Sequence, residues 1–293
     1  MNLCNPSVIR EVMAEAGIRF RQEYGQNFLI DPTVPERIAD ACCDDPNSLI
    51  LEIGPGVGSL TACLAERYRQ VLAVEIDRGL IGVLEKTLSD YDNVTVVNQD
   101  VMKVNLPELL GEACEGREIG KDVHVSVCAN LPYYITTPIL MRLLECGVPF
   151  SSITVMIQKE VAARLTAAPG SADYGAITAV LGYYGTTKKL FGVPHGAFLP
   201  APKVDSAVIR IDLYGEKPLK PKNEKLFFDV IRGAFEMRRK TLINALNAKI
   251  PGLSKEKIAG ALVTMGLSET VRGERLSTEQ FVTLSDLLYD AMK

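Results

Sequence analysis

Glycines and acidic side chains stand at the ends of apolar runs in the first hundred residues, an arrangement that suits binding of a nucleoside-containing ligand. The run LILEI is followed by three alternating glycines, Gly54, Gly56 and Gly58, and the next two runs end at Glu75 and Asp100. Glycine lets the backbone pass closely under a ligand and adopt conformations that a side chain would strain. Since the carboxyl ends of parallel strands meet at one edge of a sheet, we expect these residues to form one site.

The glycine spacing distinguishes between two kinds of cofactor. Dinucleotide folds use G-x-G-x-x-G and rest a pyrophosphate on the following helix, whereas this chain has G-x-G-x-G with Glu52 two residues ahead. An acid there repels a pyrophosphate and suits the sulfonium and amino group of S-adenosylmethionine. Glu75 is then placed to accept both ribose hydroxyls, and Asp100 lies near the adenine amine. The alternatives are a plain turn for the glycines and solvated loop-end acids for Glu75 and Asp100.

The stretch ANLPYY at 129–134 follows another apolar run and offers chemistry for an exocyclic amine. NLPY resembles the N/D-P-P-Y/F loop of methyltransferases that modify such amines, whose nitrogen is a poor nucleophile. The side-chain oxygen of Asn130 and the backbone carbonyl of Leu131 can accept its two N–H bonds and reshape the nitrogen, so no general base is required. Pro132 fixes the loop, and Tyr133 is expected to stack on a base swung out of its helix or loop. A turn with buried tyrosines is the alternative.

The elements that must position these residues alternate between β-rich and helical patterns from Ser48 to Asp212, which predicts an α/β fold with a parallel sheet covered by helices. We expect a Rossmann-like, class I methyltransferase sheet of seven strands, at LILEI, QVLAVEI, VTVVNQ, VHVSVCA, SITVMIQ and near AVLGYYG and VDSAVIRI. A helix in PSVIREVMAEAGI belongs to an N-terminal extension of about 30 residues. The polar stretch YGEKPLKPKNEK indicates a linker. Four helical patterns follow it, the second in RRKTLINALNA. The predicted domains are 1–214, for the cofactor, and 215–293, helical and facing RNA.

The charge distribution favours the same division. The net charge is −4, but residues 215–293 hold 14 Lys and Arg against 10 Asp and Glu, so this part is net +4 and the remainder net −8. A basic part joined to an acidic one suggests a nucleic-acid-facing region, although solvated helix faces also show such an excess. No apolar run approaches the roughly 18 residues of a membrane helix, and the start of the chain is charged. We expect a cytoplasmic protein with no membrane partner.

Cysteine and histidine usage gives no sign of a metal site. The seven cysteines form no C-x-x-C pair and fall mostly in helix or strand patterns, which is typical of reduced core thiols. The two histidines are His124, in an apolar strand pattern, and His195, beside Pro194. Two isolated histidines do not make a multi-histidine metal site or a catalytic triad, so we expect no metal.

Seven motifs together resemble the ribosomal RNA adenine dimethyltransferase family. They occur in family order from about Arg19 onward and cover nearly the whole chain: YGQNFLID, LEIGPGVGSLT, VEID, NLPYYITTPIL, QKEVAARL, FLPAPKVDSAV and RRKTLINAL. The resemblance is strongest to the small-subunit branch of the family. It implies S-adenosylmethionine-dependent dimethylation of two adjacent adenosines in the 3′-terminal loop of 16S rRNA, within the small ribosomal subunit, and a role in small-subunit biogenesis.

The resemblance also implies roles for individual residues. Asn27 and Leu29 would close over the cofactor, beside Gly54, Gly56, Glu75, Asp100 and Asn130. Phe198 would be the second face of an adenine sandwich opposite Tyr133, and a core aromatic is the alternative. Basic residues would contact rRNA phosphates, with solvated helix faces as the alternative: Arg19, Arg21, Arg238, Arg239 and Lys240. Glu23 departs from a position that tends to be basic and weighs against its segment as an RNA contact.

Three other functions stay open. A 23S rRNA adenine methyltransferase of the antibiotic-resistance type has a similar loop, but NLPYYITTPIL with FLPAPKVDSAV and the helical tail disfavour it. A small-subunit assembly factor, with methylation secondary, shares the same sequence features. An NAD-dependent oxidoreductase is disfavoured by the glycine spacing and by the lack of a histidine at a hydride site. Nothing in the sequence indicates a dimer seam, so we expect a monomer.

Overall fold

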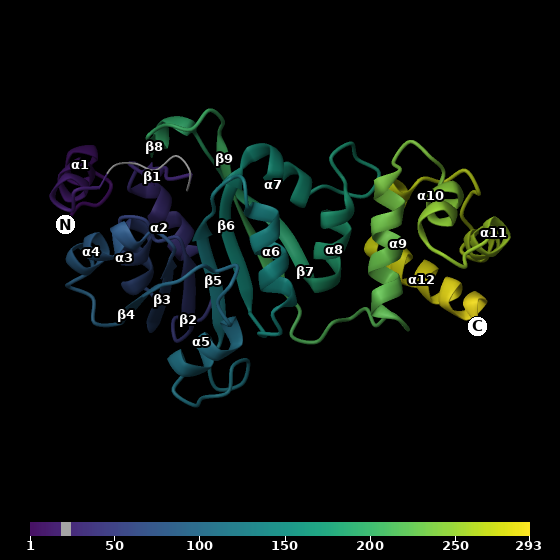
Figure 1. Ribbon diagram of the computed structural model, residues 1–293, viewed down its shortest axis with the longest axis horizontal. Helices are drawn as coiled ribbons and strands as arrows, with labels where there is room; N and C mark the ends of the chain where they lie inside the picture. Colours follow the sequence, from purple (N-terminus) through teal and green to yellow (C-terminus); the bar gives the residue numbers. More distant parts are fainter. Residues whose placement is uncertain (19–24) are drawn as a thin grey trace. The chain divides into compact units, whose positions relative to one another are not determined.

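The computed structural model of the protein describes residues 1–18 and 25–293 and forms two compact units (Figure 1). The first unit comprises Met1–Ala162 and Lys188–Gly215, and the second comprises Ala163–Thr187 and Glu216–Lys293. One division falls at residue 215, where the linker pattern placed it. Residues 163–187, which we expected in the first domain, instead pack with the helices of the second unit, so that part of the predicted boundary is corrected.

A seven-stranded sheet forms the centre of the first unit, as the sequence predicted. Its strand order is β4 (Val94–Asn98), β3 (Gln70–Glu75), β2 (Leu49–Ile53), β5 (Val125–Asn130), β6 (Ser152–Gln158), β9 (Ser206–Leu213) and β7 (Gly185–Val193). The strands from β4 to β6 are parallel. The sheet is nevertheless mixed, because β9 runs antiparallel to β6 with Ser152 opposite Asp212.

The strand order reverses between β2 and β5, and this reversal places the site. The chain moves outward from β2 through β3 to β4 and then returns to β5 and β6 on the other side. In open α/β sheets, ligands bind outside the carboxyl ends of the strands at such a reversal. The register aligns Ile53 with both Val74 and Ala129, so the residues that follow these strands reach one level of this edge.

Helices and a two-stranded ribbon complete the first unit. The helices are α1 (Pro6–Glu15), α2 (Thr33–Asp40), α3 (Ser59–Ala65), α4 (Arg78–Thr87), α5 (Leu106–Ala113), α6 (Thr136–Glu145) and α7 (Lys159–Leu165), the last of which crosses the division. A buried cluster joins α2 and α3 to the sheet residues Ile50, Cys128 and Met156. The ribbon pairs β1 (Phe28–Leu29) with β8 (Phe198–Leu199), which follows a 3-10 turn at His195–Ala197.

The second unit is helical around one buried core. It contains α8 (Ala176–Tyr184), α9 (Glu224–Glu236), α10 (Leu242–Lys249), α11 (Lys255–Thr264), a 3-10 turn at Gly273–Arg275, and α12 (Thr278–Met292). Polar side chains mark the helix starts: Asn223 accepts a hydrogen bond from the Leu226 amide at α9, and Ser277 forms a capping box with Gln280 at α12. The stretch RRK lies in the turn before α10, not within the helix as we expected.

One predicted strand is wrong. AVLGYYG belongs to α8, and strand β7 begins only at Gly185. A short apolar run fits a strand or a buried helix equally well by periodicity, and tertiary packing decides between them. Gly182 lets α8 approach α12 so closely that an added Cβ would lie 2.4 Å from Thr278 Oγ1, and the Tyr183 ring packs 5.0 Å from the ring of Phe227.

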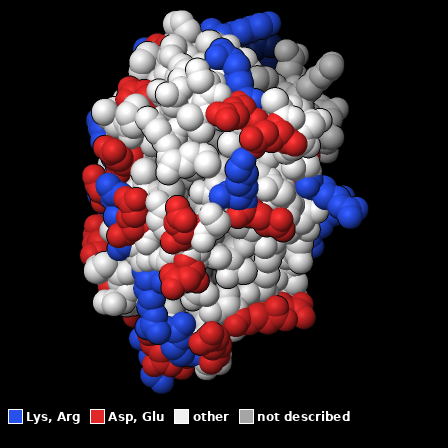
Figure 2. All heavy atoms as spheres, turned by 90° about the vertical axis from the view of Figure 1, so that its left-hand side faces the viewer, with Lys and Arg blue, Asp and Glu red and all other residues white. Residues whose placement is uncertain are grey.

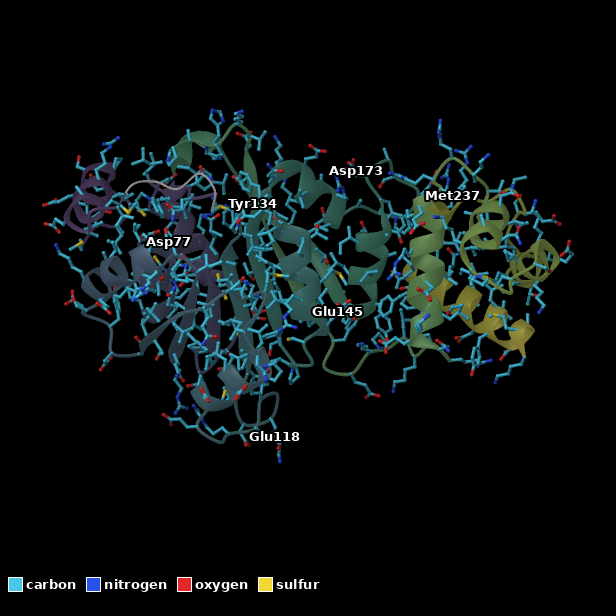
Figure 3. The ribbon with its side chains drawn as sticks, in the orientation of Figure 1. Asp77, Glu118, Tyr134, Glu145, Asp173 and Met237 are labelled. Atoms are coloured by element: carbon cyan, nitrogen blue, oxygen red, sulfur yellow. The ribbon has the colours of Figure 1, made fainter. Side chains whose placement is uncertain are left out.

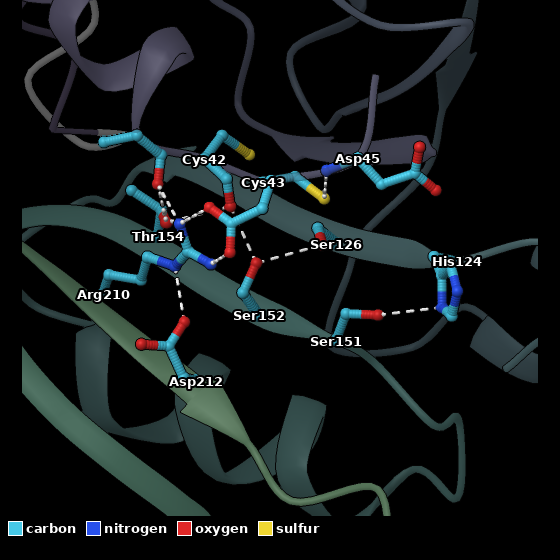
Figure 4. Close-up of polar contacts among 12 residues, drawn as sticks. Cys42, Cys43, Asp45, His124, Ser126, Ser151, Ser152, Thr154, Arg210 and Asp212 are labelled. Carbon is cyan, nitrogen blue, oxygen red and sulfur yellow. Dashed lines mark hydrogen bonds and ion pairs between the residues drawn. The ribbon is translucent and has the colours of Figure 1, made fainter. Parts of the chain in front are cut away.

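A polar cluster occupies the edge of the sheet where the parallel strands begin (Figure 4). The Arg210 guanidinium, on β9, donates to both carboxylate oxygens of Asp44 at 2.9 and 2.8 Å and to Asp212 Oδ1 at 2.6 Å. Ser152 Oγ donates to the Cys42 carbonyl at 2.7 Å and lies 3.0 Å from Ser126 Oγ. The buried members of this cluster, Arg210, Ser152 and Ser126, are all paired, and their bonds join the strands to the segment that follows α2.

Surface residues complete the description of the first unit. Acidic and basic side chains are interspersed on the face that carries α1 and α4 (Figure 2). His124 is exposed in the turn before β5, 3.5 Å from Ser151 Oγ, and is not inside a strand as the apolar pattern suggested. All seven cysteines are free, and five of them are buried. Among the described helices, none is long and apolar enough to span a membrane.

Candidate active site

A pocket opens at the carboxyl edge of β2, β3 and β5, where the strand order reverses. It opens onto about 690 Å³ of space that no protein atom fills, including space open to solvent. Seven residues expected at the site from the sequence line it together: Asn27, Leu29, Gly54, Gly56, Glu75, Asn130 and Pro132.

The glycine loop forms the floor of the pocket. Gly54 has φ +70°, and no atom lies within 4 Å of the position that a Cβ would take, so a ligand can approach the backbone there. Gly56 has φ +63°, and an added Cβ would lie 2.9 Å from the Phe28 ring. Both positions therefore require glycine, the first to leave the pocket open and the second to let β1 close against the loop.

Glu75 is held at the end of β3 by backbone donors. Its side chain is buried, its Oε1 accepts a hydrogen bond from the Asp77 amide at 2.8 Å, and its Oε2 accepts one from the Gly56 amide at 3.4 Å. Burial raises the pKa of this carboxyl, and the two amides oppose the rise by stabilising the charged form. The carboxylate is thus fixed between the glycine loop and the next helix, and Glu75 lines the pocket.

Glu52 supplies an acid deeper in the same pocket. It is 1% exposed, and its Oε2 has no hydrogen-bond partner in the part of the chain that the structure describes. Burial raises the pKa of Glu52 to about 8, the nearby Thr61 hydroxyl opposes the rise, and the nearby Glu75 adds to it. An unpaired buried acid is costly unless a ligand supplies its partner, so this oxygen fits a cationic group. The residues present therefore suit a positively charged ligand better than a pyrophosphate.

Asp100 is not among the residues that line the pocket. Its Oδ1 accepts a hydrogen bond from the Met102 amide at 2.9 Å, and its Oδ2 lies 3.5 Å from Lys103 Nζ. The carboxylate thus closes its own turn. Ile76 lines the pocket instead and is 47% exposed, and sequence reasoning missed it, although its place directly after Glu75 in VEID was a usable signal.

The acceptor loop is tied to the N-terminal segment through Asn130. Asn130 Nδ2 donates to the Asn27 carbonyl at 3.2 Å, and Asn27 Nδ2 donates to the Gly25 carbonyl at 2.9 Å. This bond fixes the orientation of the Asn130 amide, whose oxygen is its hydrogen-bond acceptor and can accept a bond from a substrate. Leu131 is buried, and its amide donates to the Met156 carbonyl at 3.1 Å, which continues the pairing of β5 with β6.

The aromatic residues near this loop differ in their surroundings. The Tyr133 hydroxyl lies 2.6 Å from Ser206 Oγ, and partial burial raises its pKa. Phe198, expected opposite Tyr133, is 2% exposed in the core cluster of α2 and α3, so the structure places it as a core aromatic outside the pocket lining. Tyr134, which we did not single out, is 64% exposed.

The predicted RNA contacts separate into three groups. Arg238 donates to the carbonyls of Ala172 and Tyr174 at 3.0 and 3.2 Å, which is a structural role. Arg239 and Lys240 are exposed, and no ion pair among the described residues includes them. Arg19 and Arg21 lie outside the described residues. A group of three or more metal-ligating side chains is not found in residues 1–18 and 25–293.

Comparison with known proteins identifies the family. The model of the family described as ribosomal RNA adenine dimethylase matches residues 17–290. The chain is 46% identical over 293 residues to ribosomal RNA small subunit methyltransferase A of Lachnoclostridium phytofermentans, covering 99% of each chain. It is 44% identical over 283 residues to the Alkaliphilus metalliredigens protein of the same name, covering 97% of this chain and 96% of that protein.

Two solved structures share the fold. The 23S rRNA methyltransferase ErmE matches with a TM-score of 0.69 and 28% identity over 90% of this chain and all of that chain. A dimethyladenosine transferase from Plasmodium falciparum matches with a TM-score of 0.72 and 24% identity over 87% and 95% of the two chains. These likenesses confirm the Rossmann-like methyltransferase fold expected from the sequence. Together with the nearly full-length match of the family, they show that the chain belongs to the ribosomal RNA adenine dimethylases and is a methyltransferase enzyme.

Proposed function

We propose that the protein dimethylates the exocyclic amines of two adjacent adenosines in the 3′-terminal loop of 16S rRNA, within the small ribosomal subunit. The observation that carries the proposal is the orientation of Asn130, whose amide nitrogen is engaged by the Asn27 carbonyl at the pocket, leaving its oxygen to accept from an amine. The names of the relatives at 43–46% identity support the small subunit as the target, against 28% identity to the 23S rRNA enzyme.

The family and fold imply a methyl donor of the S-adenosylmethionine type, and we propose S-adenosylmethionine itself. When bound, it supplies an electrophilic methyl group on a positively charged sulfur. Glu75 would hold the ribose hydroxyls, Glu52 would give its unpaired oxygen to the cationic end, and the open backbone at Gly54 would permit close approach. Asn27 and Leu29 would form the wall that closes over it.

The acceptor chemistry in this proposal depends on positioning rather than on a base. Asn130 Oδ1 and the Leu131 carbonyl would accept the two N–H bonds of the adenine amine, so that the lone pair of its nitrogen points away from them. The ring of Tyr133, fixed by Ser206, would stack on the target base. The proton that the nitrogen loses passes to water, because the methylated ammonium is acidic.

Contacts with RNA would come from exposed cations. Arg239 and Lys240 are candidates for phosphate contacts, and Arg19 and Arg21 remain predictions. Each phosphate contact that is lost should reduce the magnitude of the slope of log affinity against log salt concentration by about 0.7–0.9. Titration of small subunits with Arg239→Ala and Lys240→Ala across salt concentrations measures this slope. The proposed substrate places the protein in the cytoplasm, and the predicted monomer is measurable by light scattering.

The experiment that tests the function is mass spectrometry of rRNA fragments. Purified protein is incubated with methyl-labelled S-adenosylmethionine and small subunits from cells that lack this modification. We expect two labelled dimethyladenosines in the 3′-terminal fragment of 16S rRNA. Label in 23S rRNA from a parallel incubation with large subunits would instead support the antibiotic-resistance type. Tight binding to small subunits without any label would support the assembly-factor role.

A further inference from the structure

The carboxyl edge of the sheet carries exposed apolar side chains as well as the pocket. Six large hydrophobic side chains are exposed in the described part of the chain, and three of them, Ile76, Tyr134 and Val204, lie beside strand ends of this edge. Ile76 lines the pocket, and Val204 lies two residues before Ser206, the partner of Tyr133. Tyr134 is the most exposed of the three and, within the described residues, the one aromatic ring of the six.

Neighbouring tyrosines of the acceptor loop have opposite surroundings. Tyr133 is partly buried, and its hydroxyl is 2.6 Å from Ser206 Oγ, so its ring has one orientation. Tyr134 is 64% exposed, and no hydrogen bond or ring contact of the described residues involves it. Because most of the Tyr134 side chain is exposed to water, little of its surface is buried and it contributes little to the stability of the fold. Exposed apolar groups beside a site often mark a binding surface.

The position of Tyr134 follows from its contacts with the pocket rim. A Cβ built on Gly25 would lie 3.3 Å from Pro132 Cβ and 3.6 Å from Tyr134 Cε1. Gly25 and Pro132 both line the pocket, whereas Tyr134 does not. The Tyr134 ring therefore lies against the outside of the rim, one residue beyond Tyr133. Figure 3 shows Tyr134 at the same edge of the first unit as Asp77, which follows β3.

We propose that Tyr134 is a stacking platform for the nucleobase adjacent to the adenosine that is being methylated. The inference rests on the function proposed above and adds a residue that positions the substrate. A base swung out of an RNA loop leaves its neighbour without a stacking partner, and proteins replace this lost stacking with aromatic side chains. Because the two target adenosines are adjacent, the neighbour held by Tyr134 during one round of transfer is the other target.

The test compares Tyr134→Ala and Tyr134→Phe with the wild type on two small-subunit substrates. One substrate carries the natural 16S rRNA, and the other carries an abasic nucleotide beside one target adenosine, introduced by ligation of a synthetic 3′ segment. Val263→Ala, on α11 of the second unit and 61% exposed, is the matched control for loss of an exposed apolar side chain. Transfer to the remaining target is measured as kcat and KM, with the S-adenosylmethionine affinity and thermal unfolding of each variant.

On natural subunits we expect Tyr134→Ala to lower kcat/KM by about ten- to a hundredfold, as for loss of one stacked base, and Tyr134→Phe to stay within about twofold of the wild type. On the abasic substrate the wild type should fall to the level of Tyr134→Ala, and the variant should fall no further. Cofactor affinity and unfolding should not change in either variant.

Three results would overturn the inference. Wild-type activity of Tyr134→Ala on natural subunits would show that the ring does not hold the substrate. If Tyr134→Ala lost as much activity as the wild type when the abasic nucleotide replaces the neighbouring base, the ring would have a partner other than this base. A weakened cofactor affinity would show that Tyr134 acts through the pocket. The proposed function is judged separately by the wild type on natural subunits: absence of label there removes that function and this inference together, whereas label without a Tyr134 effect removes only the inference.

Discussion

The two edges of the central sheet carry polar clusters built in opposite ways. At the edge where the parallel strands begin, the Arg210 guanidinium has acceptors in three residues, and the Ser152 hydroxyl is paired. At the edge where they end, Glu52 keeps a buried oxygen without a partner, and Gly54 leaves space beside the backbone. Both clusters belong to the same unit and the same sheet, so the difference reflects what each edge does.

This contrast distinguishes polar groups that stabilise the fold from polar groups that are available to bind a ligand. Paired buried polar groups lower the free energy of the folded state relative to a broken pair, and their removal leaves partners unsatisfied. Unpaired groups at a pocket raise that free energy until a ligand supplies the partner, which is why perturbed acids gather at functional sites. Variants at one edge should therefore change stability, and variants at the other should change transfer.

The largest effect is expected for Asn130→Ala. Methyl transfer should fall by about 10²–10³-fold, because removal of one preorganised polar partner of the reacting group costs this much in comparable sites. The free energy of unfolding should fall by no more than about 1 kcal/mol, through loss of the bond to the Asn27 carbonyl. Single-turnover methylation and urea unfolding measure the two quantities. A variant with nearly wild-type transfer would refute the role given to Asn130.

At the opposite edge, Arg210→Met should lower the free energy of unfolding by about 2–3 kcal/mol. The change removes the Arg210 donor from Asp212 Oδ1 and from the Ala41 carbonyl, which keep, respectively, Lys188 at 2.9 Å and a long bond from Thr154 Oγ1 at 3.5 Å. Asp44, with 87% of its side chain exposed, regains water. Urea unfolding measures the loss, and transfer by the remaining folded protein should stay within about twofold of the wild type. A stable but inactive Arg210→Met variant would break the comparison.

The pH dependence of Glu52 sharpens the comparison further. Burial raises its pKa to about 8 from an ordinary 4.5, so between these values the folded protein holds a proton that the unfolded chain has lost. Its contribution to stability therefore falls as pH rises from about 4.5 to 8 and is constant above 8. Binding of a cation to the ionised acid should strengthen about tenfold per pH unit below 8. Unfolding measured across pH should show the first trend, and titration calorimetry with S-adenosylmethionine the second. Glu52→Gln should show neither trend, and the surface variant Glu269→Gln, as control, should show both.

The smallest effect is expected for Ser152→Ala, which removes one hydroxyl from the paired cluster. The buried Cys42 carbonyl loses its 2.7 Å donor, and the free energy of unfolding should fall by about 1 kcal/mol. Transfer should not change, because the residue lies at the edge away from the pocket. Chemical unfolding with a parallel methylation assay measures both, and a larger loss of transfer than of stability would contradict the separation of the two edges.

The sequence was sufficient to predict the parts of the site that follow strand ends. Gly54, Glu75 and Asn130 meet because parallel pairing brings the ends of β2, β3 and β5 to one level, and local residue types mark those ends. Asp100 also follows a strand, but its carboxylate accepts a hydrogen bond from the backbone of its own turn. The spacing of residues does not reveal whether an acid at a strand end bonds to the backbone or to a ligand.

Features that depend on distant packing were not predictable in the same way. The helix α8 was mistaken for a strand because its apolar run has no clear period. It packs against Phe227 and Thr278, which follow its contacting residues Tyr183 and Gly182 by 44 and 96 positions. Arg210 and Asp44 are 166 residues apart, and no local pattern indicates that they pair. The burial of Phe198 likewise depends on its packing against α2 and α3.

The short ribbon of β1 and β8 has a consequence for how the protein is made. Phe28 pairs with Leu199, and the Ile30 amide donates to the Ala197 carbonyl, so the wall of the pocket that is translated first has its partner about 170 residues later. A ribosome-bound nascent chain that ends before β8 has emerged therefore contains the glycine loop and the acceptor loop but cannot close the pocket around them. Competence to hold the methyl donor should consequently appear late in synthesis, at one step, when residues 197–199 leave the exit tunnel.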